Sequence, residues 1–387
     1  LLQELNIDNF DTSQVVNMTN MFSLNRNIRN LKLNNFNTEK VQDMSFMFLR
    51  CSNLKELDVS MFNTKNVMNF ASMFEGCSFL EKINVTNFDT SQAIDINSMF
   101  KDCSSINILD VSNFKTGNIK NMSYTFSNCN SLSRLDVSKF ETKNVEDMSN
   151  MFQYCSSLTS LNLNNFDTSK VINMAKMFQN NKLLKYLDIS NFQTKNVKDM
   201  SFMFEECLSL SNLDVSNFDT SQVMSMAYMF NNCGNVKPLD VSKFITKNVK
   251  YMQYVFNGVK SVQVLNVENF DTSNVEDMSY MFADCNSVTS LDVSKFNTKK
   301  VKNMRFMFSR CRYLKKIDVS NFDTSQVTDM CSMFFYCYNL KEINLSKFNT
   351  SLVDDMSYMF SYCSNILELD LSNFDTRKVT DFYYMFA

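Results

Sequence analysis

Apolar and polar positions follow one pattern that repeats every 26 residues along the chain. Phe recurs from Phe10 and Phe36 to Phe374, and a second series runs from Phe22 to Phe386 with the same step. The two series hold fifteen Phe each, together 30 of the 37 in the chain. A fixed period of this length, without insertions, predicts a solenoid in which each repeat forms one coil.

The first half of each repeat alternates between apolar and polar residues. In the third copy, Leu57 and Val59 are apolar, while Asp58 and Ser60 are polar. A period of two predicts a short strand with one buried face. Equivalent strands of successive coils should pair in parallel about 4.8 Å apart, and the crossover between them should be right-handed.

The second half of the repeat has a different period. Met44, Met47, Phe48 and Cys51 lie at i, i+3, i+4 and i+7, which is one stripe of a helix. Asp43 precedes them, and Asp or Asn fills most equivalent positions, as expected of a helix N-cap. The repeat therefore predicts an α/β solenoid, with a parallel sheet on one face and short, partly 3₁₀ helices on the other.

We expect residues 1–387 to form a single repeat domain of about fifteen coils, because the copies follow one another without a break. The chain opens at Leu1 without Met and stops at Ala387 in mid-repeat, and neither end shows a polar capping unit. The sequence thus predicts a segment of a longer protein, truncated at both ends. No signal peptide and no run long enough to span a membrane is present.

The repeat resembles the leucine-rich repeats. Residues 54–59 match the L-x-x-L-x-L start of that motif. Residues 47–54, which read M-F-x-x-C-x-x-L, are similar to a segment of the BspA-type repeats of bacterial surface proteins, and the match extends over the whole chain. The resemblance implies a leucine-rich-repeat coil, a location at the cell surface or outside the cell, and adhesion to host proteins or neighbouring cells. It implies no particular ligand.

One position departs from ordinary leucine-rich repeats. Phe62 stands where their ladder Asn or Cys would be, and Thr64 follows two residues later. All fifteen copies have Thr at that second position. We infer that the Thr hydroxyls hold the backbone amides of the turns in place of the missing Asn or Cys.

The composition removes much catalytic chemistry. The chain has no His, so Ser–His and Cys–His pairs, His bases and His metal ligands are excluded. Its four Gly are scattered singly, so no phosphate-binding loop exists. The net charge of −3 gives no electrostatic basis for binding nucleic acid. We predict a protein that is not an enzyme and that uses no cofactor or metal.

The cysteines share one position of the repeat. Eleven of the twelve occupy it, while Asn25, Asn181 and Val259 occupy it in other copies. A position that accepts Val is typical of a small buried filler. Equivalent Cβ atoms should lie near the strand spacing of about 4.8 Å, whereas a disulfide needs about 3.8 Å. A disulfide or metal staple is the alternative.

Two outward-facing rows are candidate binding sites. The first, on the strands, is acidic: Asp188, Asp214, Asp240, Asp292 and Asp318. Like charges at strand spacing are destabilising. The row is therefore either a structural Asp/Asn hydrogen-bond ladder with compensation by Lys139, Lys243 and Lys295, or a track for a basic peptide or a cation.

The second row, on the predicted helices, is aromatic: Phe202, Tyr228, Tyr254, Tyr280 and Phe306, with Phe46, Tyr124, Tyr358 and Tyr384 at the same position elsewhere. This position lies about 200° around a helix from the first core Met, so it points outward. Either the rings recognise a partner, or they stack on one another and seal the layer.

These patterns favour a cell-surface interaction module, an adhesin that binds a protein rather than a carbohydrate through repeated surface rows. The alternative is a stalk or spacer that presents another domain of a longer surface protein. A catalytic or carbohydrate-active role is a third, less favoured interpretation. The sequence does not indicate an oligomeric state.

Overall fold

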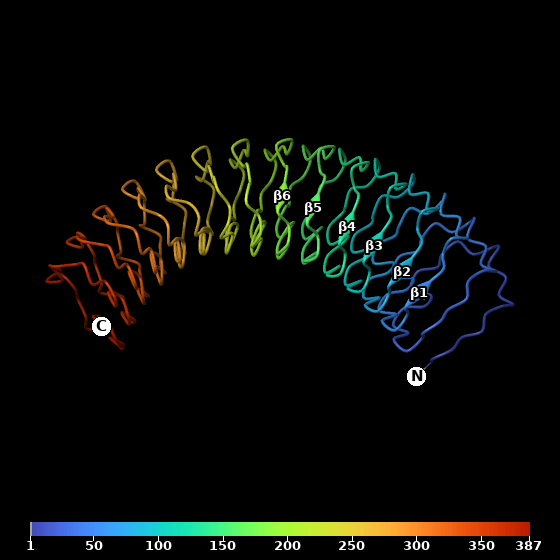
Figure 1. The fold of residues 1–387 in the computed structure, drawn as a ribbon, viewed down its shortest axis with the longest axis horizontal. Helices are drawn as coiled ribbons and strands as arrows, with labels where there is room; N and C mark the ends of the chain where they lie inside the picture. The colour runs from blue at the N-terminus through green and yellow to red at the C-terminus, as the bar shows by residue number, and fades with distance from the viewer. Residues whose placement is uncertain (1) are drawn as a thin grey trace. The chain divides into compact units, whose positions relative to one another are not determined.

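The computed structural model describes residues 2–387 and divides into two compact units, Leu1–Phe192 (unit 1) and Gln193–Ala387 (unit 2). Each unit is a stack of coils with one coil per 26-residue repeat, as the periodicity predicts (Figure 1). Within the described residues, no helix has the length and apolar character needed to cross a bilayer.

The predicted parallel sheet is confirmed in short pieces. The strands of unit 1 are β1 (Glu56–Leu57), β2 (Lys82–Ile83), β3 (Ile108–Leu109), β4 (Arg134–Leu135), β5 (Ser160–Leu161) and β6 (Tyr186–Leu187). They pair in parallel as β1–β2, β3–β4 and β5–β6, each residue with its equivalent in the next coil. In unit 2, isolated parallel β-bridges, such as that between Lys316 and Glu342, occur at the equivalent position of the repeat. The first residue of each strand is exposed and the second points inward, as the alternation requires.

The predicted helices are wrong: residues 2–387 contain no helix, and the second half of each coil is a series of tight turns. The stripe of Met44, Met47, Phe48 and Cys51 is buried as predicted. However, Phe46 and Arg50 have left-handed backbones, with φ of 58° and 54°, and equivalent left-handed residues recur through both units. Consecutive right-handed residues are needed for an α-helix, so these residues exclude it.

Hydrogen bonds between coils explain why turns form here instead of a helix. The N–H of Phe46 donates to the carbonyl oxygen of Ala71 at 2.9 Å, and that of Phe48 to Met73 at 2.9 Å, both in the next coil. The N–H groups between them close local turns, as Met47 does by donating to Met44 at 3.3 Å. A left-handed L-residue costs about 1–2 kcal/mol. That cost is offset by the hydrogen bonds that join neighbouring coils. In a helix the same N–H groups would bond within one coil.

Asp43, which the sequence predicts as a helix N-cap, closes a turn instead. Asp43 Oδ1 accepts a hydrogen bond from the N–H of Ser45 at 2.8 Å, which closes an Asx turn at the start of the turn series. The backbone of Asp43 also bridges to Asn17 and Asn69 in the neighbouring coils. The preference for Asp or Asn is therefore explained by a turn and not by a helix N-terminus.

The core of each unit is a column of equivalent side chains. Phe48 and Phe74 stack with ring centroids 5.6 Å apart, and Phe282 and Phe308 do so at 5.7 Å. These rings are fully buried. The core predicted from the two Phe series and the Met positions is confirmed, because each coil covers the apolar surface of the next.

The threonine inference is confirmed as well. In unit 1 the hydroxyl of Thr90 donates to the carbonyl oxygen of Lys115 at 3.0 Å and accepts from the N–H of Lys115 at 2.7 Å. The same pair of bonds links Thr324 to Asn349 in unit 2. One buried hydroxyl thus satisfies two backbone groups of the adjacent coil.

Candidate functional site

The aromatic row, defined as Phe202, Tyr228, Tyr254, Tyr280 and Phe306, is brought together on the turn face of unit 2. Its four successive ring centroid distances are 4.5, 4.4, 4.2 and 4.5 Å, and no two neighbouring planes differ by more than 10°. All five residues occupy the first left-handed position of their coils. They are partly exposed, so they form a continuous ridge at the surface.

Stacking determines which parts of these rings a partner can reach. The faces of Tyr228, Tyr254 and Tyr280 are each covered by a neighbouring ring on both sides. The guanidinium of Arg305 lies 5.3 Å from the ring centre of Phe306 at one end. Burial raises the pKa of Tyr254, and the adjacent Tyr280 and Tyr228 raise it further. Ring edges and phenol groups, rather than ring faces, are therefore available.

The other aromatic residues at this position do not extend the ridge. Phe46 lies between Asn20 and Ser72 in the equivalent positions of its neighbouring coils, and Tyr124 between Ser98 and Asn150. Tyr358 and Tyr384 stack on each other at 5.7 Å. The five-ring stack is thus a feature of one part of unit 2.

The aspartate row lies on the strand face, and its hydrogen bonds run within coils. Asp214, Asp240, Asp292 and Asp318 belong to unit 2, and each accepts a bond at 2.9–3.0 Å from the N–H of the Ser two residues later. Asp188, in unit 1, accepts in the same way from Ser190 at 3.0 Å. The expected ladder of side-chain bonds between coils is not the role of these carboxylates, which close Asx turns.

The electrostatics of the aspartate row favour a structural role. Hydrogen bonds from Ser216 and Ser242 lower the pKa values of Asp214 and Asp240, and Lys243 lowers both further. Hydrogen bonds from Ser294 lower the pKa of Asp292 most, and Lys295 lowers it further. The predicted compensation by Lys therefore operates, and these carboxylates need no external cation to be satisfied.

The twelve cysteines are free thiols, and eleven of them are buried. Cys77 Sγ donates to the carbonyl oxygen of Phe48 in the preceding coil at 3.2 Å, and Asn181, at the same position, donates its side-chain amide to Phe152 at 2.9 Å. The position is thus a buried donor between coils as well as a filler, which the tolerance of Val had concealed. The interpretation as a disulfide staple is wrong for these residues.

In the part of the chain that the structure describes, one group of metal-type ligands comes together, and it lies in unit 2. The side chains of Asp329, Cys331 and Asp355 place one ligand atom each within 4.8 Å of one another. Asp329 Oδ1 accepts from the N–H of Cys331 at 2.9 Å, and Cys331 Sγ accepts from the Ser357 hydroxyl at 3.2 Å. These internal bonds account for the cluster, and we assign no metal to it.

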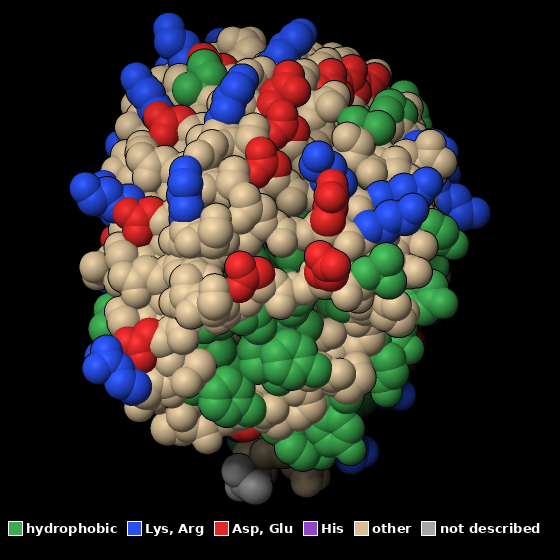
Figure 2. Space-filling view, turned by 90° about the vertical axis from the view of Figure 1, so that its left-hand side faces the viewer, with side chains coloured by type: hydrophobic (Ala, Val, Ile, Leu, Met, Phe, Trp, Pro, Cys, Tyr) green, Lys and Arg blue, Asp and Glu red, His purple; other side chains and the backbone are tan. Residues whose placement is uncertain are grey.

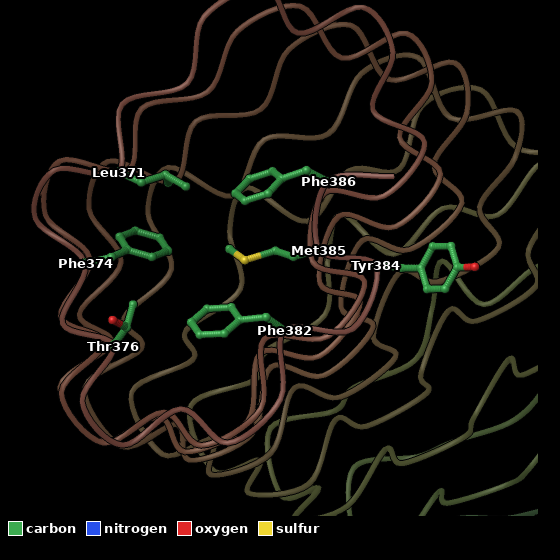
Figure 3. A pocket seen from close by; sticks show the side chains of 7 residues that line it. All are labelled: Leu371, Phe374, Thr376, Phe382, Tyr384, Met385 and Phe386. Atoms are coloured by element: carbon green, nitrogen blue, oxygen red, sulfur yellow. The ribbon is translucent and has the colours of Figure 1, made fainter.

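Two pockets differ in character. The pocket in the last coil is lined by Leu371, Phe374, Thr376, Phe382, Tyr384, Met385 and Phe386 (Figure 3). Most of these residues are equivalents of core positions, and hydrophobic side chains gather on that end face (Figure 2). It is the open side of one coil's core rather than a built site.

The second pocket, here called the basic pocket, lies in unit 1 and is lined by Arg29, Asn30, Asn53, Lys55 and Phe79. The repeat pattern does not predict this pocket, because its residues come from three coils and from several positions of the repeat. The sequence feature that could have indicated the pocket is Phe79, because the next two coils have Ser at the equivalent position, Ser105 and Ser131.

The model of a family described as "Mycoplasma protein of unknown function, DUF285" matches six overlapping segments: residues 2–107, 55–160, 79–185, 131–239, 224–317 and 307–387. No curated protein matches the sequence.

Solved structures resemble the chain in fold. A leucine-rich repeat protein from Bacteroides ovatus has a TM-score of 0.50 and 17% identity over 85% of this chain and 82% of its own. A leucine rich cell surface protein from Faecalibacterium prausnitzii has a TM-score of 0.33 and 18% identity, with 79% and 77% covered. An internalin from Listeria monocytogenes has a TM-score of 0.24 and 13% identity, with 70% and 82% covered. The first match establishes a leucine-rich-repeat solenoid. The names of these matches do not include the BspA type, which remains a resemblance.

Proposed function

The chain belongs to the family described as Mycoplasma protein of unknown function, DUF285, and from that premise we propose a non-enzymatic interaction module at the cell surface that binds another macromolecule, in the first place a protein. The family description names no activity. The surface location and the adhesin role rest on the resemblance to BspA-type repeats, and the binding surface is inferred from the geometry of unit 2.

The aromatic row is the observation that carries this proposal. Five rings held 4.2–4.5 Å apart form a ridge that is ordered before any partner arrives. Rigid aromatic side chains lose little conformational entropy on binding, and Tyr is enriched in recognition surfaces. Such a ridge is suited to protein recognition.

The exposed parts of the ridge also favour a protein partner. A sugar ring packs on an aromatic face, and the faces of the three central Tyr are covered. Ring edges and phenol groups instead match the backbone and side-chain groups of a protein surface. The aspartate row is left out of the proposed surface, because its carboxylates are bonded to Ser within each coil.

The test is the triple variant Y228S/Y254S/Y280S, measured by surface plasmon resonance against a panel of purified extracellular-matrix proteins and polysaccharides. Ser occupies the same left-handed position at Ser72, Ser98 and Ser332, so the backbone should tolerate the change. We expect binding to a matrix protein by the natural chain and its loss in the variant, with an unchanged unfolding midpoint.

A matched control removes three exposed Tyr elsewhere. Tyr186, Tyr313 and Tyr338 are 56%, 58% and 51% exposed, and Ser stands at the equivalent positions of other coils. The variant Y186S/Y313S/Y338S should bind as the natural chain does. Matrix-protein binding that survives in Y228S/Y254S/Y280S would remove the aromatic row from the proposal.

A spacer is the second candidate, and the links between coils favour it. Neighbouring coils are joined by backbone bonds on the turn face, by the Thr hydroxyls and by the Cys thiols. Elements tied at so many points resist bending, as a stalk requires. If the natural chain binds nothing in the panel, and the full-length gene encodes a further globular domain, the spacer is the better account.

A further inference from the structure

We propose that the basic pocket of unit 1 binds a saccharide that carries a carboxylate, such as an oligosaccharide containing a uronic acid. This site does not depend on the aromatic row of unit 2. The pocket has a volume of about 500 Å³, which falls within the ordinary range for small-ligand sites.

The charge of the pocket is uncompensated. Arg29 and Lys55 occupy equivalent positions in adjacent coils, so two cations lie side by side. Among the described residues, no carboxylate comes within the ion-pair distance of 4.0 Å of either, and Glu81, one coil further on, is not paired with Lys55. At the adjacent position, by contrast, Lys82 pairs with Glu56 at 3.1 Å. Like charges held together are destabilising, and a bound anion would relieve this.

The amides of the pocket are free. The side chain of Asn53 makes no hydrogen bond to any described residue, although Asn235, Asn339 and Asn365 at the same position each donate to the preceding coil at 2.6 Å. The side chain of Asn30 is likewise unbonded within residues 2–387. An amide offers two donors and an acceptor, which suits the hydroxyl groups of a sugar.

Phe79 supplies an open aromatic wall. Its side chain is 54% exposed. The equivalent residues in the neighbouring coils are Asn53 and Ser105, so no ring of residues 2–387 covers its faces, in contrast to the aromatic row. The apolar C–H face of a sugar ring can pack there. Two cations, two free amides and one open ring together match a carboxylated sugar better than an acidic peptide, which has no such face or array of hydroxyls.

The test uses isothermal titration calorimetry of the full chain at low ionic strength, because exposed charges are screened by salt. The probes are a tetrasaccharide of alternating glucuronic acid and N-acetylglucosamine, the same tetrasaccharide with its carboxyl groups reduced to alcohols, and a tetraglutamate peptide. We expect the acidic tetrasaccharide to bind, and reduction of its carboxyl groups to weaken binding about tenfold or more.

Substitutions found elsewhere in the chain provide the variants. R29Q/K55Q replaces both cations by Gln, the residue that Gln263 provides at this position in another coil. Phe79→Ser introduces the residue found at the equivalent position Ser105. The first should remove the preference for the acidic over the reduced tetrasaccharide, and the second should weaken both. The control K315Q/K341Q removes the other pair of cations in adjacent coils at this position and should change nothing, because Asn339 and Asn365 beside it are bonded to the backbone.

Several results would overturn the proposal: no binding of the acidic tetrasaccharide, equal binding of its reduced form, equal or tighter binding of tetraglutamate, or unchanged affinity in R29Q/K55Q. None of these results bears on Y228S/Y254S/Y280S, so the two proposals can fail separately.

Discussion

Thr38 and Asn63, which belong to successive coils, are joined by two hydrogen bonds that share one hydroxyl. The Thr38 hydroxyl donates to the carbonyl oxygen of Asn63 at 3.0 Å and accepts from its N–H at 2.7 Å. Thr38 is 1% exposed, so water cannot substitute for it. The side chain therefore acts as a structural link between coils.

Replacement of Thr38 by Val should destabilise the chain by about 2–6 kcal/mol, because the N–H and the carbonyl oxygen of Asn63 lose their partner at about 1–3 kcal/mol each. Urea unfolding followed by intrinsic fluorescence measures this. Thr38→Ser keeps the hydroxyl and should cost clearly less. A loss in Thr38→Ser as large as that in Thr38→Val would show that the methyl group contributes as much as the hydroxyl, and would contradict the proposed link.

The core could be predicted from the sequence, but the conformation of the turn face could not. A spacing of i, i+3, i+4 and i+7 identifies buried side chains, and Met44 and Phe48 are buried both in a helix and in the observed turns. The deciding bonds, such as Phe46 N–H to Ala71, join two copies and are invisible within one. A signal was present, since Gly76 and Gly258 stand at left-handed positions. Far-ultraviolet circular dichroism should accordingly lack a helical signature.

Gly258 gives a direct test of the turn series. Its φ is 71°, and a Cβ there would lie 3.2 Å from the Cα of Asn232. Gly258→Ala should cost about 1–2 kcal/mol in free energy of unfolding, because an L-residue is strained in the left-handed region. Gly234→Ala is the control: the nearest atom to its Cβ is 3.7 Å away and its φ is not left-handed, so the change should be neutral or slightly stabilising.

The candidate site was predictable where one position of the repeat defines it. The aromatic row could be grouped because its members recur every 26 residues, and the structure stacks them. The basic pocket could not, because Arg29, Asn53 and Phe79 meet only when the offset between coils is known. Periodicity finds rows along the stack and overlooks sites that cross it.

The cysteines should behave as inert thiols in the folded chain. Burial raises the pKa of Cys155 and of Cys285 to about 12, so little thiolate forms at neutral pH. A maleimide reagent should label the native chain slowly, beginning at the partly exposed Cys363, and label all twelve thiols once the chain is unfolded without reductant. Mass spectrometry counts the labels, and fewer than twelve after unfolding would reveal a disulfide.

A second surface position explains why neighbouring repeats differ. At this position every second coil carries an Asp: Asp219, Asp271 and Asp323. The coil that precedes each of them has a Lys two residues after the equivalent position, namely Lys195, Lys247 and Lys299. Hydrogen bonds from Ser lower the pKa of each of these Asp residues, and the preceding Lys lowers it further. The alternation of Asp-bearing and Lys-bearing coils thus keeps like charges at this position out of adjacent coils. This is a physical reason for neighbouring repeats to differ in sequence.

The aspartate row predicts how stability depends on acid. Bonds from Ser216 and Ser242 hold the pKa values of Asp214 and Asp240 below their usual 3.8 in the folded chain. A carboxyl with a lower pKa when folded stabilises the fold above its unfolded-state pKa, and this contribution is lost as the pH falls through the folded-state pKa. The free energy of unfolding should therefore decrease below about pH 4, by a small amount per residue because these side chains are exposed.

The variant D214N/D240N isolates this effect. Asn keeps the Asx turn, as Asn84 does by accepting from the N–H of Thr86 at 3.1 Å, but it does not titrate. Urea unfolding at about pH 6 and about pH 3 should show that the variant loses less stability than the natural chain over this range. Asp329→Asn should act in the opposite direction, because burial raises the pKa of Asp329 and its protonation relieves a penalty as the pH falls. If D214N/D240N were as acid-sensitive as the natural chain, the bonds from Ser would not be what holds these carboxylates ionised.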